Sequence, residues 1–129
     1  MMRPMMMLVI PALLAVSVSA QDWYQEREHR FSGDGWRSHL FLEVRTDLEH
    51  VWSGRAHQKE RNRLAKTEEQ LTKMQADLDQ TRWDHDLLED VIDSIKKSAD
   101  DERLSRRDRD ILADDIARLK AFEDMHHKH

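Results

Sequence analysis

The fold of this chain is decided by residues 61–80, RNRLAKTEEQLTKMQADLDQ. The stretch has neither Gly nor Pro, and leucine recurs every seven residues at Leu64, Leu71 and Leu78. The positions three residues after each leucine are Thr67, Met74 and Thr81. A seven-residue repeat is typical of a helix whose apolar seam packs against another helix. We therefore expect a helix over 55–80 in a short coiled-coil-like hairpin, packed either inside a small bundle or in a dimer.

Apolar residues also recur at helical spacing on both sides of this stretch, which predicts further amphipathic helices. The three stripes are Phe41, Val44, Leu48 and Val51; Leu88, Val91, Ile92 and Ile95; and Ile111, Leu112, Ile116, Leu119 and Phe122. Ser53-Gly54 is expected to end the first of these helices. Asp84 and Ser105 are expected to cap the N-termini of the other two, and Trp83 to pack on Leu88.

The composition agrees with an all-helical chain of one domain. The 129 residues include only three Gly, two Pro and no Cys. These counts disfavour a sandwich or barrel and exclude a disulfide scaffold, a cysteine zinc site and a thiol nucleophile. We expect an all-α fold in which three to four helices over 37–125 form an antiparallel, elongated bundle, followed by a His-rich tail at 126–129.

Residues 1–20 have the features of a cleavable signal peptide. Arg3 supplies the positive charge, Met5–Val16 an uncharged apolar run, and Val18-Ser19-Ala20 small residues at a cleavage site. An uncleaved N-terminal anchor is the alternative. We expect an exported protein, periplasmic or secreted, that is not inserted in the membrane after cleavage.

Residues 21–36 are polar but carry aromatic side chains and end in Ser32-Gly33-Asp34-Gly35. This composition favours an irregular arm. Trp23 and Trp36 are candidate anchors for a protein partner, because aromatic residues dominate such contacts. Packing of the arm's aromatic side chains on the helices behind it is the alternative.

Histidines supply the candidate metal ligands. His126, His127 and His129 lie close together beside Glu123 and Asp124, and neutral imidazoles can bind copper, nickel or zinc. A chain end offers no preorganised geometry, which disfavours a specific site there. A second set, His39, Glu43, Asp47 and His50, shares one helix flank, for which a solvated charged surface is the simpler interpretation.

Other chemistry lacks its characteristic motifs. The loop over 96–108 has the outline of a calcium-binding loop, but only Asp101 and Asp108 fit the ligand positions. The sequence has no HExxH, no GxSxG and no Gly-rich phosphate loop. A net charge of −5 gives no reason to expect nucleic acid as a partner. We expect no enzyme activity and no cofactor.

Leu71-Thr72-Lys73-Met74-Gln75 resembles the LTxxQ signature of periplasmic stress chaperones of the Spy and CpxP type. Those are small, exported helical proteins that cradle unfolded clients in a curved dimer. The match lies within a predicted helix, whereas the family's Thr typically begins one, and a second copy near the C-terminus is absent. The resemblance implies a periplasmic holdase as one alternative.

A broader resemblance covers roughly residues 41–122. The segments VRTDL at 44–48, LEDVI at 88–92 and LSRRDRDIL at 104–112 are similar to those of a group of small exported bacterial helical proteins. This likeness implies a fold and a compartment but no site residues. The sequence therefore predicts a non-enzymatic interaction protein that contacts itself, as a dimer for example, or an envelope partner. The expected contact residues are Leu64, Leu71, Met74, Leu78, Trp23 and Trp36. Weak transition-metal binding is a second alternative.

Overall fold

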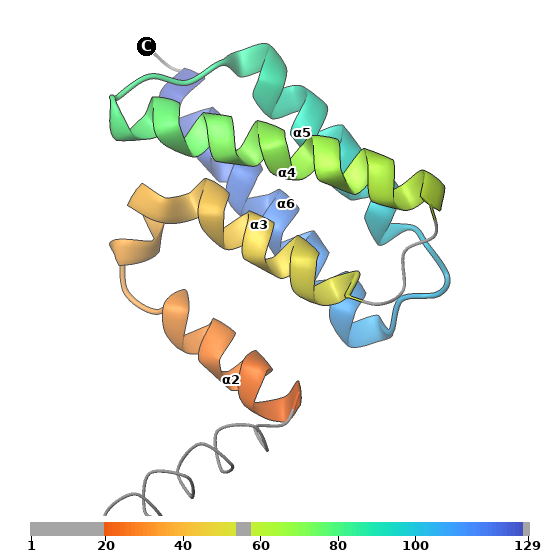
Figure 1. Cartoon of the computed structure of the whole chain (residues 1–129). Helices are drawn as coiled ribbons and strands as arrows, with labels where there is room; N and C mark the ends of the chain where they lie inside the picture. Colours follow the sequence, from red (N-terminus) through yellow and green to blue (C-terminus); the bar gives the residue numbers. More distant parts are fainter. Residues whose placement is uncertain (1–19, 54–57, 128–129) are drawn as a thin grey trace, which may run out of the picture. The chain divides into compact units, whose positions relative to one another are not determined.

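The computed structural model describes residues 20–53 and 58–127, and within these ranges the chain is helical with no strand. Its elements are α2 (Ala20–Arg30), the 3-10 helix η1 (Gly35–His39), α3 (Leu40–Val51), α4 (Gln58–Asp79), α5 (His85–Ala99) and α6 (Arg106–His127), shown in Figure 1. The all-α prediction is confirmed. The proposed signal peptide, apart from Ala20, and the proposed stop at Gly54 lie outside the described residues.

The chain divides between Trp36 and Arg37 into two compact units. The first contains α2, which corrects the prediction of an irregular arm over 21–36. The helix has an acidic residue, Asp22, in its first turn and basic residues in its last turn, an arrangement that matches the helix dipole. Because α2 is polar, its sequence lacks the apolar stripe by which the other helices were recognised.

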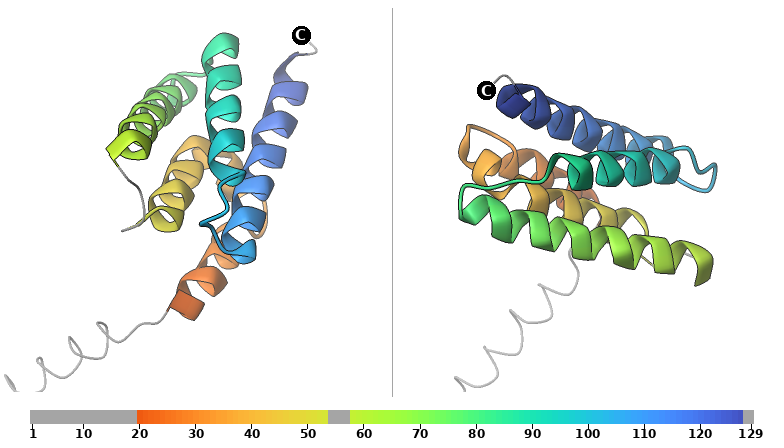
Figure 2. Two further views of the ribbon diagram at one scale, coloured as in Figure 1. Left: turned by 90° about the vertical axis from the view of Figure 1, so that its right-hand side faces the viewer. Right: turned by 90° about the horizontal axis from the view of Figure 1, so that it is seen from above.

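In the second unit, the four helices α3, α4, α5 and α6 form a bundle-like ring. Helix α3 packs on α4 and α6, and α5 packs on the same two helices. Both views in Figure 2 show α5 between α4 and α6. The buried apolar side chains of this unit are Leu40, Phe41, Val44, Leu48, Val51, Trp52, Leu64, Leu71, Met74, Leu88, Val91, Ile92, Ile95, Leu104, Ile111, Leu112, Leu119 and Phe122. The predicted stripes therefore face the core, except that Ile116 is only half-buried.

The leucine seam of α4 is occupied by packing within the chain. Leu71 and Met74 are fully buried and Leu64 is 6% exposed, whereas Leu78 is half-buried. Thr67 is buried on the same seam, and its hydroxyl is 2.7 Å from that of Ser94 in α5. This arrangement corresponds to the alternative in which the seam packs inside a small bundle.

The ends of the helices follow the capping residues. The carboxylate of Asp84 accepts a hydrogen bond from Leu87 N at 3.1 Å, and the hydroxyl of Ser105 accepts one from Asp108 N at 3.1 Å. Both predicted N-caps are confirmed. Helix α4 ends at Asp79, and Thr81 lies beyond it in a left-handed conformation with φ of 56°. Thr81 therefore lies in the turn and not in the predicted heptad seam.

The flank of α3 predicted to be solvated is partly buried. His39 is exposed, Glu43 and His50 are half-exposed, but Asp47 is fully buried. Because α3 packs on both α4 and α6, its covered face is wider than its apolar stripe. No described helix combines the length and apolarity needed to cross a membrane.

Candidate functional site

The predicted partner anchors lie in and around α2 and η1. Trp23 is half-buried and contacts Tyr24 edge to face, with ring centroids 5.3 Å apart. Trp36 is also half-buried, and its Nε1 donates a hydrogen bond to Gly33 O at 3.0 Å. The ring of Phe31 is 5.6 Å from that of Trp36. Both tryptophans therefore keep part of their apolar surface in contact with solvent.

The residues of the LTxxQ-like segment connect α4 to α3. Leu71 lies in the core, and Thr72 Oγ1 accepts a hydrogen bond from Arg45 Nη1 at 2.6 Å. Gln75 is buried, with its Nε2 donating to Ser38 O at 2.7 Å and its Oε1 accepting from Leu42 N at 3.3 Å. Leu42 N belongs to the first turn of α3, whose N-terminal amides need acceptors. The preceding His39 makes no side-chain capping bond, so Gln75 performs that task from another helix.

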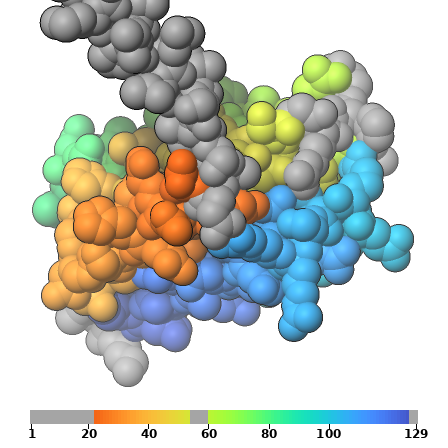
Figure 3. All heavy atoms as spheres, turned by 90° about the horizontal axis from the view of Figure 1, so that it is seen from below, coloured from red at the N-terminus to blue at the C-terminus, as the bar shows by residue number. Residues whose placement is uncertain are grey.

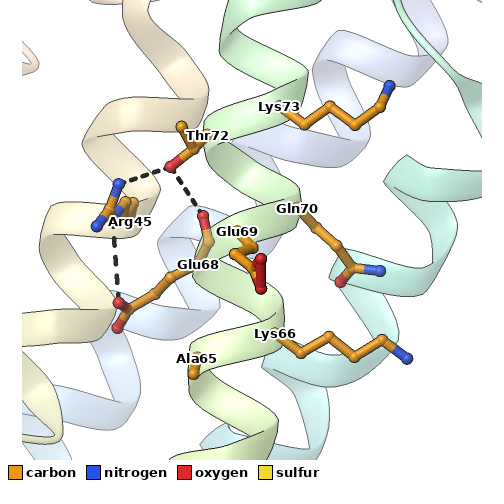
Figure 4. Close-up of a pocket in the computed structure, with 8 residues that line it drawn as sticks. All are labelled: Arg45, Ala65, Lys66, Glu68, Glu69, Gln70, Thr72 and Lys73. Carbon is orange, nitrogen blue, oxygen red and sulfur yellow. Dashed lines mark hydrogen bonds and ion pairs between the residues drawn. The ribbon is translucent and has the colours of Figure 1, made fainter.

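A hollow of about 670 Å³ lies beside these residues, mainly along α4 (Figure 4). Arg45 Nε lies 4.0 Å from a carboxylate oxygen of Glu68 on its wall. Burial, followed by repulsion from Glu49, raises the pKa of Glu68. The hollow is lined mostly by long polar and charged side chains, and it opens to solvent. Side chains of this kind can change rotamer to contact a polar surface of another molecule.

A second cluster joins the first two turns of α5 to the last turns of α6. His85, Glu89 and Glu123 each present one potential ligand atom, and these three atoms lie within 4.8 Å of one another. His85 Nε2 is 2.9 Å from Glu123 Oε2. The side chain of Glu123 is only 16% exposed, whereas His85 is 46% exposed. The surface of α6, blue in Figure 3, can be followed along one face of the molecule.

Aromatic side chains border this cluster. The ring centroid of Trp83 is 5.8 Å from that of His85, 5.6 Å from that of Phe122 and 5.9 Å from that of His126. His126 stacks on Phe122 with centroids 4.1 Å apart, and its Nδ1 is 2.9 Å from Phe122 O. The contact expected between Trp83 and Leu88 stays a prediction. The indole of Trp83 lies beside the ring of Phe122.

The Glu89 carboxyl group influences the ionisation of Glu123. A hydrogen bond with the Glu89 carboxyl group, followed by burial and repulsion from Glu89, raises the pKa of Glu123. The nearby His85 acts in the opposite direction. The cluster therefore brings two carboxyl groups and one imidazole together.

The structure groups the histidines differently from the sequence prediction. His126 lies against Phe122, while the side chain of His127 and all of His129 lie outside the described residues. Glu123, which the sequence placed beside this tail, meets His85 instead. The four-residue spacing of His85 and Glu89 is a signal that the sequence analysis missed. The participation of Glu123 depends on the packing of α5 on α6.

The loop compared with a calcium site is closed by an ion pair. Asp101 accepts hydrogen bonds from Arg103 Nε at 3.0 Å and Nη2 at 2.6 Å. These bonds lower the pKa of Asp101 well below its ordinary value. Arg103 Nη2 also lies 3.3 Å from Glu60 of α4. The carboxylate of Asp101 therefore already has a cationic partner.

Comparison with known proteins yields no match to a family model, to a curated protein or to a solved structure.

Proposed function

We propose that this chain is a non-enzymatic exported protein that acts through contacts of its helix faces, either with a second copy or with an envelope partner. In this proposal the helices of the second unit form an antiparallel scaffold. The observation that carries it is that Trp23 and Trp36 of the first unit are only half-buried and keep part of their surface accessible. Tryptophan supplies a large apolar contact area at low cost in conformational entropy and is enriched among the residues that dominate interfaces.

The seam residues contribute to this proposal in a different way. Leu64, Leu71 and Met74 are buried, so they support the scaffold, while the half-buried Leu78 retains some surface for contact. The amino-terminal sequence supports export, because a charged start, an apolar run and small residues near position 20 are typical of a signal peptide.

The proposal is tested with a photo-crosslinking residue at position 23 or 36 in living cells, and at exposed Ala113 of α6 as a control. We expect discrete adducts from positions 23 and 36 and none from position 113. Sedimentation at several concentrations then separates self-association from binding to another protein. Equal crosslinking from all three positions, or none from any, would contradict the proposal.

The resemblance of Leu71–Gln75 to the LTxxQ signature supports a second candidate, a periplasmic holdase. A holdase slows the aggregation of a denatured client protein at equimolar dimer. Light scattering measures the aggregation, and an unchanged rate in the presence of this protein would remove this candidate. The crosslinking experiment does not depend on that outcome.

A further inference from the structure

We propose that His85, Glu89 and Glu123 form a site for a divalent transition metal, with Zn²⁺ as the representative ion. The three side chains come from two helices, and one ligand atom of each lies within 4.8 Å of the other two. This site is independent of the proposed interaction surface around α2. It also differs from the His-rich tail, since its imidazole belongs to the first residue of α5.

The donor set matches zinc chemistry. Zinc binds imidazole nitrogen at about 2.0–2.1 Å and carboxylate oxygen at about 2.0–2.2 Å, so tetrahedral ligand atoms lie roughly 3.3–3.5 Å apart. His85 Nε2 and Glu123 Oε2, at 2.9 Å, are slightly closer than this and need only a small outward movement to reach it. The remaining separations, at most 4.8 Å, close by side-chain rotation of the exposed Glu89. Three protein ligands leave a fourth position for water, as in open zinc sites.

The charge of the site favours a cation. A carboxylate oxygen of Glu89 and one of Glu123 lie within 4.8 Å of each other at the cluster. Glu123 Oε2 is shielded from solvent, and although His85 Nε2 is 2.9 Å away, the two do not align as a hydrogen bond. The C-terminal end of a helix also carries partial negative charge, and Glu123 lies near that end of α6. A metal ion bound here would interact favourably with that partial negative charge.

Two further side chains lie near the imidazole. Asp86 Oδ1 lies 3.7 Å from His85 Nδ1, the ring nitrogen that is not directed at Glu123. A carboxylate near the second ring nitrogen is the usual outer partner of a metal-bound histidine. Trp83 covers the ring at a centroid distance of 5.8 Å. The site therefore has neighbouring side chains outside the three proposed ligands.

The test is calorimetric titration of the full chain with Zn²⁺ in a non-coordinating buffer. We expect saturable binding of one ion, with the dissociation constant raised at least about tenfold by either His85→Ala or Glu123→Gln. Two controls should retain the original affinity: His39→Ala, which removes an exposed histidine elsewhere, and the triple variant His126→Ala/His127→Ala/His129→Ala. Helical circular dichroism without zinc verifies that each variant is folded.

A second readout uses the neighbouring indole. Cu²⁺ bound at the cluster should quench the fluorescence of Trp83, so the quenched component should disappear in Trp83→Phe and persist in Trp36→Phe. The proposal is overturned if zinc does not bind saturably, if His85→Ala keeps the original affinity, or if the tail variant loses binding. Quenching that persists in Trp83→Phe would equally place the metal elsewhere.

Discussion

At the scale of single residues, Gln75 shows how one buried amide connects two helices. Its amide nitrogen donates to Ser38 O and its oxygen accepts from Leu42 N, so both ends of the group are satisfied. The nitrogen is also 3.0 Å from Asp79 Oδ1. Burying a polar group costs little free energy when the group is hydrogen-bonded. Removing it costs more than the net contribution of the bond when the former partners are left buried and unsatisfied.

We predict that Gln75→Ala lowers the free energy of unfolding by about 1–3 kcal/mol, because it removes the hydrogen bonds of Gln75 to Ser38 O and Leu42 N together with the packing of a buried side chain. Urea unfolding followed by circular dichroism measures this loss. Gln70→Ala, on the half-buried wall of the hollow, is the matched control and should change stability by less than about 0.5 kcal/mol. Equal midpoints for the two variants would show that the bonds of Gln75 contribute nothing.

Glu68 gives a prediction for the pH dependence of stability. Its pKa is raised in the folded chain, so the folded state binds the proton more tightly than the unfolded state. Ionisation of Glu68 therefore destabilises the folded state relative to the unfolded state. This loss of stability is absent at pH values below the ordinary pKa of a glutamate, and it develops as the pH rises through the pKa that Glu68 has in the folded chain. We therefore predict that Glu68→Gln raises stability at pH 7, by less than about 1 kcal/mol because solvent screens the site.

The difference between wild type and Glu68→Gln should disappear near pH 4, where the carboxyl group of the wild type is largely protonated. Thermal unfolding at pH 4 and pH 7 measures it. Glu69→Gln, which changes the exposed neighbour, is the control and should not show this dependence. A Glu68→Gln variant that is less stable than the wild type at pH 7 would mean that the attraction of Arg45 outweighs burial and the repulsion of Glu49.

At the scale of elements, the C-terminus of α4 has the hydrogen bonds of a Schellman motif. Arg82 N donates to Asp77 O at 2.8 Å and Thr81 N to Leu78 O at 2.8 Å. The motif places Thr81 at φ of 56°, a conformation that is unfavourable for a β-branched residue and natural for glycine. The turn between α4 and α5 is therefore strained at one position.

We predict that Thr81→Gly stabilises the fold by about 0.5–1 kcal/mol, since relief of the left-handed strain, worth roughly 1–2 kcal/mol, exceeds the added entropy of the unfolded chain. Thr81→Ala keeps the β-carbon and so should gain no comparable stability. Chemical denaturation of the two variants distinguishes these cases. A Thr81→Gly variant no more stable than Thr81→Ala would mean that the turn carries no strain.

Sequence periodicity predicted four of the helices because each buries an apolar stripe, and the polar caps Asp84 and Ser105 marked two of their starts. Helix α2 was missed because its sequence, AQDWYQEREHR, has no such stripe. The metal cluster was missed for another reason. Glu123 meets His85 only through the packing of α6 on α5, and no local spacing encodes that contact.

At the scale of the whole molecule, the second unit depends on one core shared by four helices. Leu71 is fully buried, and the rings of Phe41 and Phe122 meet with centroids 5.2 Å apart. Since every helix of the ring contributes side chains to this core, damage at one position destabilises all four.

We predict that Leu71→Asp costs at least about 2 kcal/mol, because it buries a charge without a partner. Leu42→Asp is the matched control on α3, where the leucine is 42% exposed, and should change stability by less than about 0.5 kcal/mol. The melting temperatures of the two variants, each compared with that of the wild type, measure both changes in stability. An unchanged melting temperature for Leu71→Asp would contradict the burial of that position.

The contact made by Gln75 also makes one helix dependent on its neighbour. Helix α3 precedes α4 in the chain, yet the acceptor for its Leu42 amide is carried by a residue of the later helix. Without α4, that amide must rely on water for its hydrogen bond. A peptide limited to α3 therefore lacks an acceptor that the folded chain supplies from a distant part of its sequence.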